Sequence, residues 1–317
     1  YIYLSVVVLF LFTLNGCTKI NYTSDPYSLL EFSEDTLLFD SVFTTIGSVS
    51  FYLSVKNPHD EALLIDRIEL EDGLGSEYRI NIDGQGVDEF GDPLTSLQDV
   101  TILPQDSLYI FVEVTVDPTS STSAFINKDR IRFRTNGSDQ FVVLIAYGRN
   151  AAFHYQPGNW FDSSNPPDNI LECDEIWTSD LPHVIYGPIR VKPGCSLTIE
   201  AGAEVYLHPG SGIWVQGGSI HIEGSLQDKV VFQGDRLDSW YENIPGQWDR
   251  IWLTPGSFDN EINYAIIKNG TIGVHADTVA NNNPTVIIKN SIIKNMSSIG
   301  LLGQGAKIEM SNTVISK

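Results

Sequence analysis

The second half of the chain repeats short apolar runs at a nearly constant interval, and this feature constrains the fold more than any other. Leu197–Glu200 returns 23 residues later as Ile220–Glu223. Ile266–Asn269 returns 26 residues later as Ile292–Asn295, with the order Ile-Ile-Lys-Asn kept. One unit of this size cannot bury its own apolar side, so neighbouring units must stack. The strict consensus of a leucine-rich repeat is absent, and the sequence predicts stacked β-coils.

The period and the β-branched content of the repeat resemble the coils of a right-handed parallel β-helix of the pectate-lyase-like superfamily. Ile199–Val205 and Trp248–Leu253 also resemble coil openings in Bacteroidetes β-helix lipoproteins of unassigned function. The resemblance implies a right-handed parallel β-helix over residues 189–317. The last repeat stops at Lys317 in mid-coil. We therefore expect this domain to be truncated at the C-terminus.

The first half predicts a β-sandwich, because short alternating strands are separated there by turn residues and no helical periodicity competes. About seven strands in about 115 residues are typical of that architecture. The clearest predicted strands are Phe51–Val55, Leu63–Leu70, Ser107–Val114, Arg130–Arg134 and Gln140–Ala146.

Four short motifs in this half look like those of the Hydin-like and major-sperm-protein-like immunoglobulin domains. They are Val55–Pro58, Leu63–Ile65, Ile102–Ser107 and Thr135–Gly137. The resemblance covers roughly residues 39–147. It implies an Ig-like fold with an adhesive or scaffolding role, and no enzyme activity.

We therefore expect an all-β chain in which an N-terminal Ig-like β-sandwich is followed by a right-handed parallel β-helix. Residues 151–188 differ from both, because they carry Pro-Gly and Asn-Pro-Pro sequences among scattered aromatics. The predicted segments are a signal peptide (1–16), a lipid-anchored tether (17–30), the sandwich (31–150), a linker or cap (151–188) and the incomplete β-helix (189–317).

An apolar run from Ile2 to Phe12 ends in Leu14-Asn15-Gly16-Cys17. This pattern resembles the lipobox of bacterial lipoprotein signal peptides. The resemblance implies cleavage before Cys17, acylation of that residue by chains such as palmitate, and an outer-membrane lipoprotein facing the periplasm or the cell surface. Two or more acyl chains anchor a protein stably. The alternative is an uncleaved signal-anchor helix. The chain starts at Tyr1, so we expect the true N-terminus to be missing.

Two cysteines remain once Cys17 is assigned to lipidation. An even pair in an oxidising compartment predicts a disulfide between Cys173 and Cys195. The alternative is two buried free thiols.

The chain is strongly acidic, with 19 Lys and Arg against 40 Asp and Glu and a net charge of −21. No basic stripe is visible in either half, so nucleic acid is excluded as a partner. The expected partners are the membrane, through the lipid anchor, and a glycan or another envelope protein.

No motif of nucleophilic, zinc or nucleotide chemistry occurs, and no histidines are paired at ligand spacing on one predicted element. His208 and His221 could approach each other on successive coils. Glu200 and Glu223 stack at the 23-residue offset and could act as paired carboxylates or bind calcium. Two outward, solvated positions are the simpler interpretation. We expect no catalytic residue, no metal and no cofactor.

An acidic loop in the first half contains Asp83, Asp88, Glu89 and Asp92. Oxygen ligands at this density could hold Ca²⁺. Their spacing does not match an EF-hand, so a solvated hairpin loop is the interpretation we adopt.

The segment from Gly234 to Gln247 interrupts the repeat, and insertions in solenoids often carry the binding face. Trp240 and Tyr241 lie in it and are the candidate glycan contacts. Trp248 and Trp252 begin the next strand and are predicted to be core. The sequence thus predicts a lipid-anchored envelope protein with a non-catalytic structural, adhesive or glycan-binding role. The alternative is a polysaccharide lyase or glycoside hydrolase on the β-helix.

Overall fold

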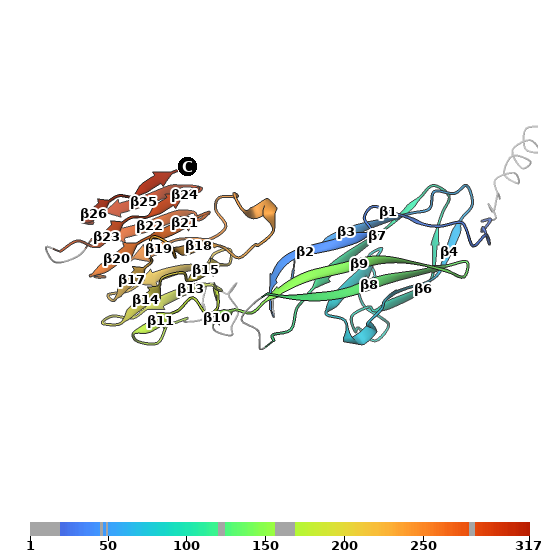
Figure 1. Ribbon diagram of the computed structural model, residues 1–317, viewed down its shortest axis with the longest axis horizontal. Helices are drawn as coiled ribbons and strands as arrows, with labels where there is room; N and C mark the ends of the chain where they lie inside the picture. Colours follow the sequence, from blue (N-terminus) through green and yellow to red (C-terminus); the bar gives the residue numbers. More distant parts are fainter. Residues whose placement is uncertain (1–19, 45–46, 49, 120–123, 156–168, 279–282) are drawn as a thin grey trace, which may run out of the picture. The chain divides into compact units, whose positions relative to one another are not determined.

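A computed structural model describes residues 20–44, 47–48, 50–119, 124–155, 169–278 and 283–317 (Figure 1). Within these residues the regular elements are strands and short 3-10 turns, so the prediction of an all-β chain is confirmed. The chain divides into two compact units. We name them the antiparallel unit (Tyr1–Phe39, Gly47–Thr115 and Asn127–Ala146) and the parallel unit (Asp40–Ile46, Val116–Ile126 and Tyr147–Lys317).

The antiparallel unit is built on two sandwich-like sheets, and their strands β2, β8 and β9 also contribute residues to the parallel unit. One sheet has the order β1 (Glu31–Phe32), β3 (Phe51–Lys56), β7 (Ser107–Val114), β5 (Tyr78–Ile82). The other has the order β2 (Thr36–Phe43), β9 (Ser138–Arg149), β8 (Phe125–Thr135), β4 (Leu63–Leu70), β6 (Ser96–Ile102). The short turn η2 (Gly73–Gly75) follows β4.

The alternating sequence of these strands explains their burial. In β7 every second side chain is buried, which is the period-two pattern of a strand with one face on a core. Asn57 shows why the Asn-Pro turn is needed. Its buried amide donates to the carbonyl oxygens of Glu61, Ile102 and Leu103. Between β8 and β9, Asn136 and its glycine neighbour both have positive φ, the conformation that a tight Asn-Gly hairpin requires.

The parallel unit consists of three parallel sheets that take strands in rotation from β11 onward. The seven-stranded sheet contains β10 (Ala152–His154), β12 (His183–Ile185), β15 (Glu204–Leu207), β18 (Val230–Gly234), β21 (Ala265–Lys268), β24 (Ile292–Lys294) and β27 (Val314–Ser316). The six-stranded sheet contains β11 (Glu175–Trp177), β14 (Ser196–Glu200), β17 (Ser219–Glu223), β20 (Asn260–Asn263), β23 (Val286–Lys289) and β26 (Ile308–Ser311). The five-stranded sheet contains β13 (Pro188–Val191), β16 (Gly212–Val215), β19 (Ile251–Leu253), β22 (Ile272–Asp277) and β25 (Ile299–Gln304). This connectivity is consistent with a parallel β-helix.

Inward side chains of all three sheets form one core of mostly Ile, Val and Leu. Asparagines with positive φ close many of the turns, and their side chains bond to one another from coil to coil. Asn295 donates to Asn269 at 2.8 Å, and Asn312 donates to Asn290 at 2.6 Å. These ladders explain why Asn recurs with the repeat, because each amide finds a hydrogen-bond partner on the neighbouring coil.

Residues 151–188, expected to be a linker or cap, contribute β10, β11 and β12, which pair as the first strands of two parallel sheets. Cys173 and Cys195 are joined by a disulfide, with 4.9 Å between their Cα atoms. The prediction for the two tryptophans holds for one only. Trp248 is buried in the core, whereas Trp252 is half-buried and faces outward, in register with Trp214 and His275.

Candidate functional site

The loop that interrupts the repeat, Asp235–Gln247, connects β18 to the run leading into β19, and we refer to it as the 235–247 loop. It contains the short 3-10 turn η3 (Ser239–Tyr241). The Gln247 amide nitrogen donates to the carbonyl oxygens of Tyr241 at 2.6 Å and Ile244 at 2.7 Å. The side chain of Gln247 is buried, so these bonds fix the loop from the inside.

The next two coils hold the same loop from outside. The amide nitrogen of Asn269 donates to the carbonyl oxygen of Glu242 at 2.9 Å. The amide nitrogen of Asn295, one coil further, donates to the carbonyl oxygen of Asn243 at 2.8 Å. The Asn ladder of the turns thus extends onto the loop backbone. The loop is therefore a fixed part of the surface of the parallel unit.

The two predicted glycan contacts lie together on η3 but differ in exposure. Trp240 is 77% exposed. Tyr241 is partly covered, because the guanidinium carbon of Arg236 lies 4.1 Å from its ring centre. Arg236 is in turn paired with Asp238 at 3.2 Å. Trp240 thus offers an open aromatic face, while Tyr241 takes part in a cation–π contact that orders the beginning of the loop.

Sequence reasoning missed a polar stack at the base of this loop. Tyr186, His208 and Asp235 each follow a strand of the seven-stranded sheet on three successive coils. The His208 Nδ1 atom lies 2.7 Å from the Asp235 carboxylate, and the Tyr186 ring stacks on the imidazole at 4.3 Å. Burial, and then the Asp235 carboxylate, raise the pKa of the Tyr186 hydroxyl. The signal that could have revealed this stack is that all three residues directly follow a strand of the same sheet. His208 therefore pairs with Asp235, and not with His221, which lies on the six-stranded sheet.

Glu200 and Glu223 are register partners on β14 and β17, and both are exposed. A hollow of about 280 Å³ lies beside the second of them, lined among others by His221, Glu261 and Asn263. The two carboxylates occupy equivalent positions on adjacent parallel strands and project from the same face. They could flank a small ligand, although the hollow is lined by Glu223 and not by Glu200.

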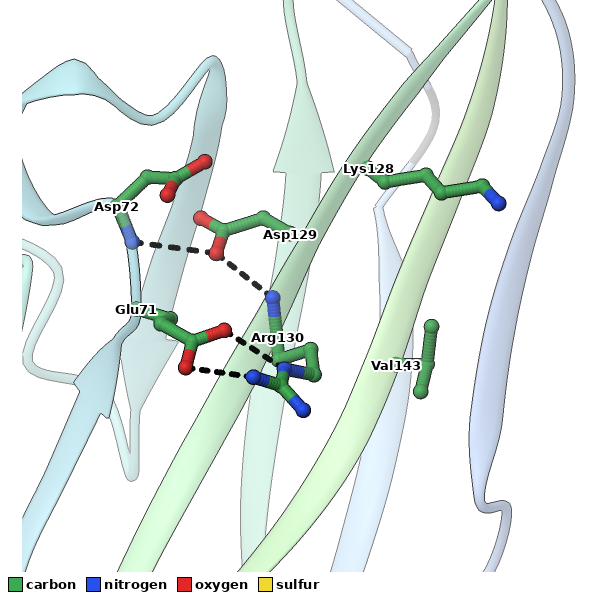
Figure 2. A pocket seen from close by; sticks show the side chains of 6 residues that line it. All are labelled: Glu71, Asp72, Lys128, Asp129, Arg130 and Val143. Carbon is green, nitrogen blue, oxygen red and sulfur yellow. Dashed lines mark hydrogen bonds and ion pairs between the residues drawn. The ribbon is translucent and has the colours of Figure 1, made fainter.

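The antiparallel unit has a second hollow, of about 250 Å³, at the start of β8 (Figure 2). Its charged groups are largely satisfied internally. Glu71 accepts two hydrogen bonds from Arg130, which lower the pKa of this carboxyl. The buried Asp129 carboxylate accepts the Ser76 hydroxyl at 2.6 Å and the backbone N–H of Arg130 at 2.7 Å. Lys128 extends away from these pairs in Figure 2. We interpret these pairs as contacts that hold the strands together, and not as a binding site.

The acidic loop of the antiparallel unit closes on itself. The Asp88 carboxylate accepts the backbone N–H groups of Phe90 at 2.9 Å and Asp92 at 3.0 Å. Within the described residues, no three His, Cys, Asp or Glu side chains are grouped so as to hold a metal ion. The two bonds to Asp88 hold this segment as a tight turn.

The first coils of the parallel unit contain a pair of histidines that the sequence did not reveal, because 29 residues separate them. His154 Nε2 lies 2.9 Å from His183 Nδ1, and both rings stack against Trp177. Burial, and secondarily His183, lower the pKa of His154 to about 3, and burial also lowers the pKa of His183. Both imidazoles are therefore neutral at pH 7, and both stack on the buried ring of Trp177.

The proposed lipidation site, Cys17, and the apolar run before it lie outside the described residues. In the part of the chain that is described, no helix has the length and apolar character needed to cross a membrane. The lipobox prediction thus rests on the sequence.

No protein-family model and no curated protein matches this chain. The chain is similar to several solved structures. One is a family 123 glycoside hydrolase from Clostridium perfringens, at 7% identity over 38% of this chain and 27% of that chain, with a TM-score of 0.26. A second is PapD-like domain 7 of human CEP192, at 11% identity over 43% of this chain and 92% of that chain, with a TM-score of 0.25. A third is the E. coli chaperone DraB, at 13% identity over 42% of this chain and 58% of that chain, with a TM-score of 0.24. The chain spans less than two thirds of the hydrolase and of DraB. All three TM-scores are below 0.5, so these likenesses carry no argument.

Proposed function

We propose that this chain is a lipid-anchored envelope protein that binds glycan without transforming it. In this proposal an Ig-like sandwich precedes a right-handed parallel β-helix, and acylated Cys17 tethers both to the outer membrane on its periplasmic or cell-surface side. The rotation of strands among three parallel sheets supports the β-helix, and the antiparallel sheets support the sandwich. The observation that carries the glycan-binding role is the exposed Trp240 on a loop that its neighbours hold in place.

Trp240 exposes most of its indole on a loop whose backbone is held in place. The indole exposes apolar area that could be buried if the loop folded over, yet the bonds from Gln247, Asn269 and Asn295 hold the loop backbone. A preorganised aromatic face loses little conformational entropy on binding. Sugar rings present C–H faces that stack on such surfaces, and the polar groups of Arg236 and Asp238 stand nearby to meet hydroxyl groups.

The test is a glycan array probed with the full chain and two single variants. Trp240→Ala should weaken binding by roughly 0.5–1.5 kcal/mol, the contribution of one aromatic contact beyond its buried area. Phe90→Ala is the matched control, because Phe90 is 82% exposed on a loop of the antiparallel unit. Equal binding by the wild type and Trp240→Ala would remove the loop as the site.

The lipid anchor has a separate test. Mass spectrometry of the native protein should find an acylated Cys17 at the N-terminus. A peptide that spans Gly16 and Cys17 intact in most molecules would contradict the anchor and leave the glycan proposal standing.

An enzyme remains the second candidate because Glu200 and Glu223 are in register. Adjacent strands are about 4.8 Å apart, close to the separation of about 5 Å between the carboxyl groups of retaining glycosidases. We nevertheless propose that the protein is not catalytic, because both carboxylates project from one face. Purified protein should release no reducing sugar and no unsaturated product from pectin, alginate or host glycans. Activity that Glu223→Gln abolishes would reverse this conclusion.

A further inference from the structure

Two lysines stand side by side on successive coils of the parallel unit. Lys268 ends β21 and Lys294 ends β24, and the two residues are register partners. Each follows a buried isoleucine, so both side chains project from the outer face of the seven-stranded sheet. Their backbones are one strand spacing apart, about 4.8 Å. The repeat in the sequence therefore places two positive charges together.

Among the residues that the structure describes, neither lysine has a carboxylate within ion-pair distance. Two lysines on or next to the six-stranded sheet do have such a partner, since Lys289 pairs with Glu261 at 3.1 Å and Lys307 lies 3.6 Å from Glu309. Like charges at directly opposed positions of a sheet are destabilising. A chain with a net charge of −21 has many carboxylates with which to neutralise such a pair. Within the described part of the chain, Lys268 and Lys294 are particular because two lysines without an ion pair are register partners on adjacent strands.

The surroundings of Lys268 disfavour its charged form, and the neighbouring charge of Lys294 is one of the causes. Burial and the charge of Lys294 lower the pKa of Lys268, and Glu242 on the 235–247 loop opposes them with a smaller effect. The backbone of Lys268 is also fixed, because its carbonyl oxygen accepts the Trp248 indole N–H at 2.9 Å. The coil geometry thus holds the backbones of the two lysines side by side.

The lysine pair lies next to the loop that carries Trp240. Asn269 and Asn295 directly follow the two lysines and donate to the loop backbone at Glu242 and Asn243. These bonded positions are two and three residues from Trp240 in sequence. An exposed aromatic face and an unneutralised pair of cations therefore belong to one region of the surface.

We propose that Lys268 and Lys294 bind the acidic group of a glycan, a carboxylate or a sulfate, whose sugar ring stacks on Trp240. This inference rests on the proposed glycan-binding function and names its ligand class. An acidic group between the two ammonium ions would relieve their repulsion and form two charge-assisted hydrogen bonds. The rest of the surface repels polyanions, so the pair also selects where such a chain can settle.

The experiment measures binding of the full chain by titration calorimetry to polymers that differ in charge. The probes are polygalacturonate for the carboxylate, its fully methyl-esterified form for the same backbone without charge, heparin for the sulfate, and dextran as a neutral polymer. The variants are Lys268→Met with Lys294→Met, Trp240→Ala, and Lys289→Met as the matched control on another sheet. Circular dichroism checks that each variant folds.

We expect the chain to bind at least one acidic polymer and to prefer it to the neutral probes. The double lysine variant should weaken that binding about tenfold, the scale of two partly exposed charge contacts, and added salt should weaken the wild type in the same way. Lys289→Met should bind as the wild type does. The probe that binds best shows whether the acidic group is a carboxylate or a sulfate.

Three results would overturn the inference, and they differ in what they say about the proposed function. Binding of neutral polymers alone, lost in Trp240→Ala and kept in the double lysine variant, would refute the acidic ligand and preserve the proposed function. If the double lysine variant bound an acidic polymer as tightly as the wild type does, the role of the two lysines would be refuted and the proposed function would be preserved. Absence of binding to every probe would contradict both proposals.

Discussion

The hollow of the antiparallel unit and the surface beside the 235–247 loop of the parallel unit differ in how their charged groups are paired. In the antiparallel unit, Glu71 is bonded twice to Arg130, and the carboxylate of Asp129 is bonded to a hydroxyl and to backbone N–H groups. In the parallel unit, Lys268 and Lys294 stand together without a carboxylate partner, beside the loop that exposes Trp240. A surface that satisfies its own charges is suited to a scaffold. One that leaves charge and aromatic area open is suited to binding.

The largest expected effect separates the two cores. Phe133 and Phe232 are fully buried, one in each unit. Replacing either with alanine should lower the free energy of unfolding of its own unit by about 3–5 kcal/mol, because a large cavity is left. Hydrogen exchange measured by mass spectrometry should show faster exchange in the mutated unit alone. If each variant loosened both units equally, the comparison between separate units would fail.

The disulfide should affect only the parallel unit, and to a smaller extent. It closes a loop with a sequence separation of 22 residues. In the chain-entropy model a loop of this length contributes about 3 kcal/mol. Replacing both Cys173 and Cys195 with serine should therefore lower the melting temperature of this unit. A melting temperature identical to that of the wild type under non-reducing conditions would contradict the prediction.

The buried histidine pair gives the parallel unit a dependence on pH. The folded-state pKa of His154 is about 3, below the value of about 6.5 for an exposed histidine, so the unfolded chain binds more protons between these values. The stability of the unit should be fully present above pH 6.5 and should fall as the pH is lowered toward 3. The melting temperature of the unit, measured from pH 7 to pH 4, tests this dependence. His154→Phe should flatten this decline, and an equal decline in the variant would refute the assignment.

The smallest effect is expected for the ion pair between Glu71 and Arg130. Both side chains are more than 40% exposed, and exposed pairs contribute little to stability. Glu71→Gln should change the melting temperature by no more than about 1 °C. A clearly larger fall in the melting temperature would show that this ion pair contributes substantially to stability. It would also weaken the contrast between the units.

Much of the backbone could be predicted from the sequence, because strand alternation and coil period act locally. The predicted run Ser107–Val114 matches β7, and the repeat of Ile266–Asn269 at Ile292–Asn295 became paired strands in register. Glu200 and Glu223 likewise became register partners. Each of these predictions needed only a spacing and an apolar pattern.

The side-chain partners could not be predicted in the same way. His208 meets Asp235, and His154 meets His183, across turns of different length that hide their common position. Trp252 was expected in the core, but strand alternation turns it outward. The strands within 151–188 escaped notice because they are only three residues long and carry no internal repeat.

The central claim is that the parallel unit, at the 235–247 loop, carries the binding site. Hydrogen exchange of the full chain with and without the glycan that binds best tests this directly. We predict slower exchange on binding in residues 235–247 and around Lys268 and Lys294, with no change in the antiparallel unit. Slower exchange confined to the antiparallel unit would contradict it.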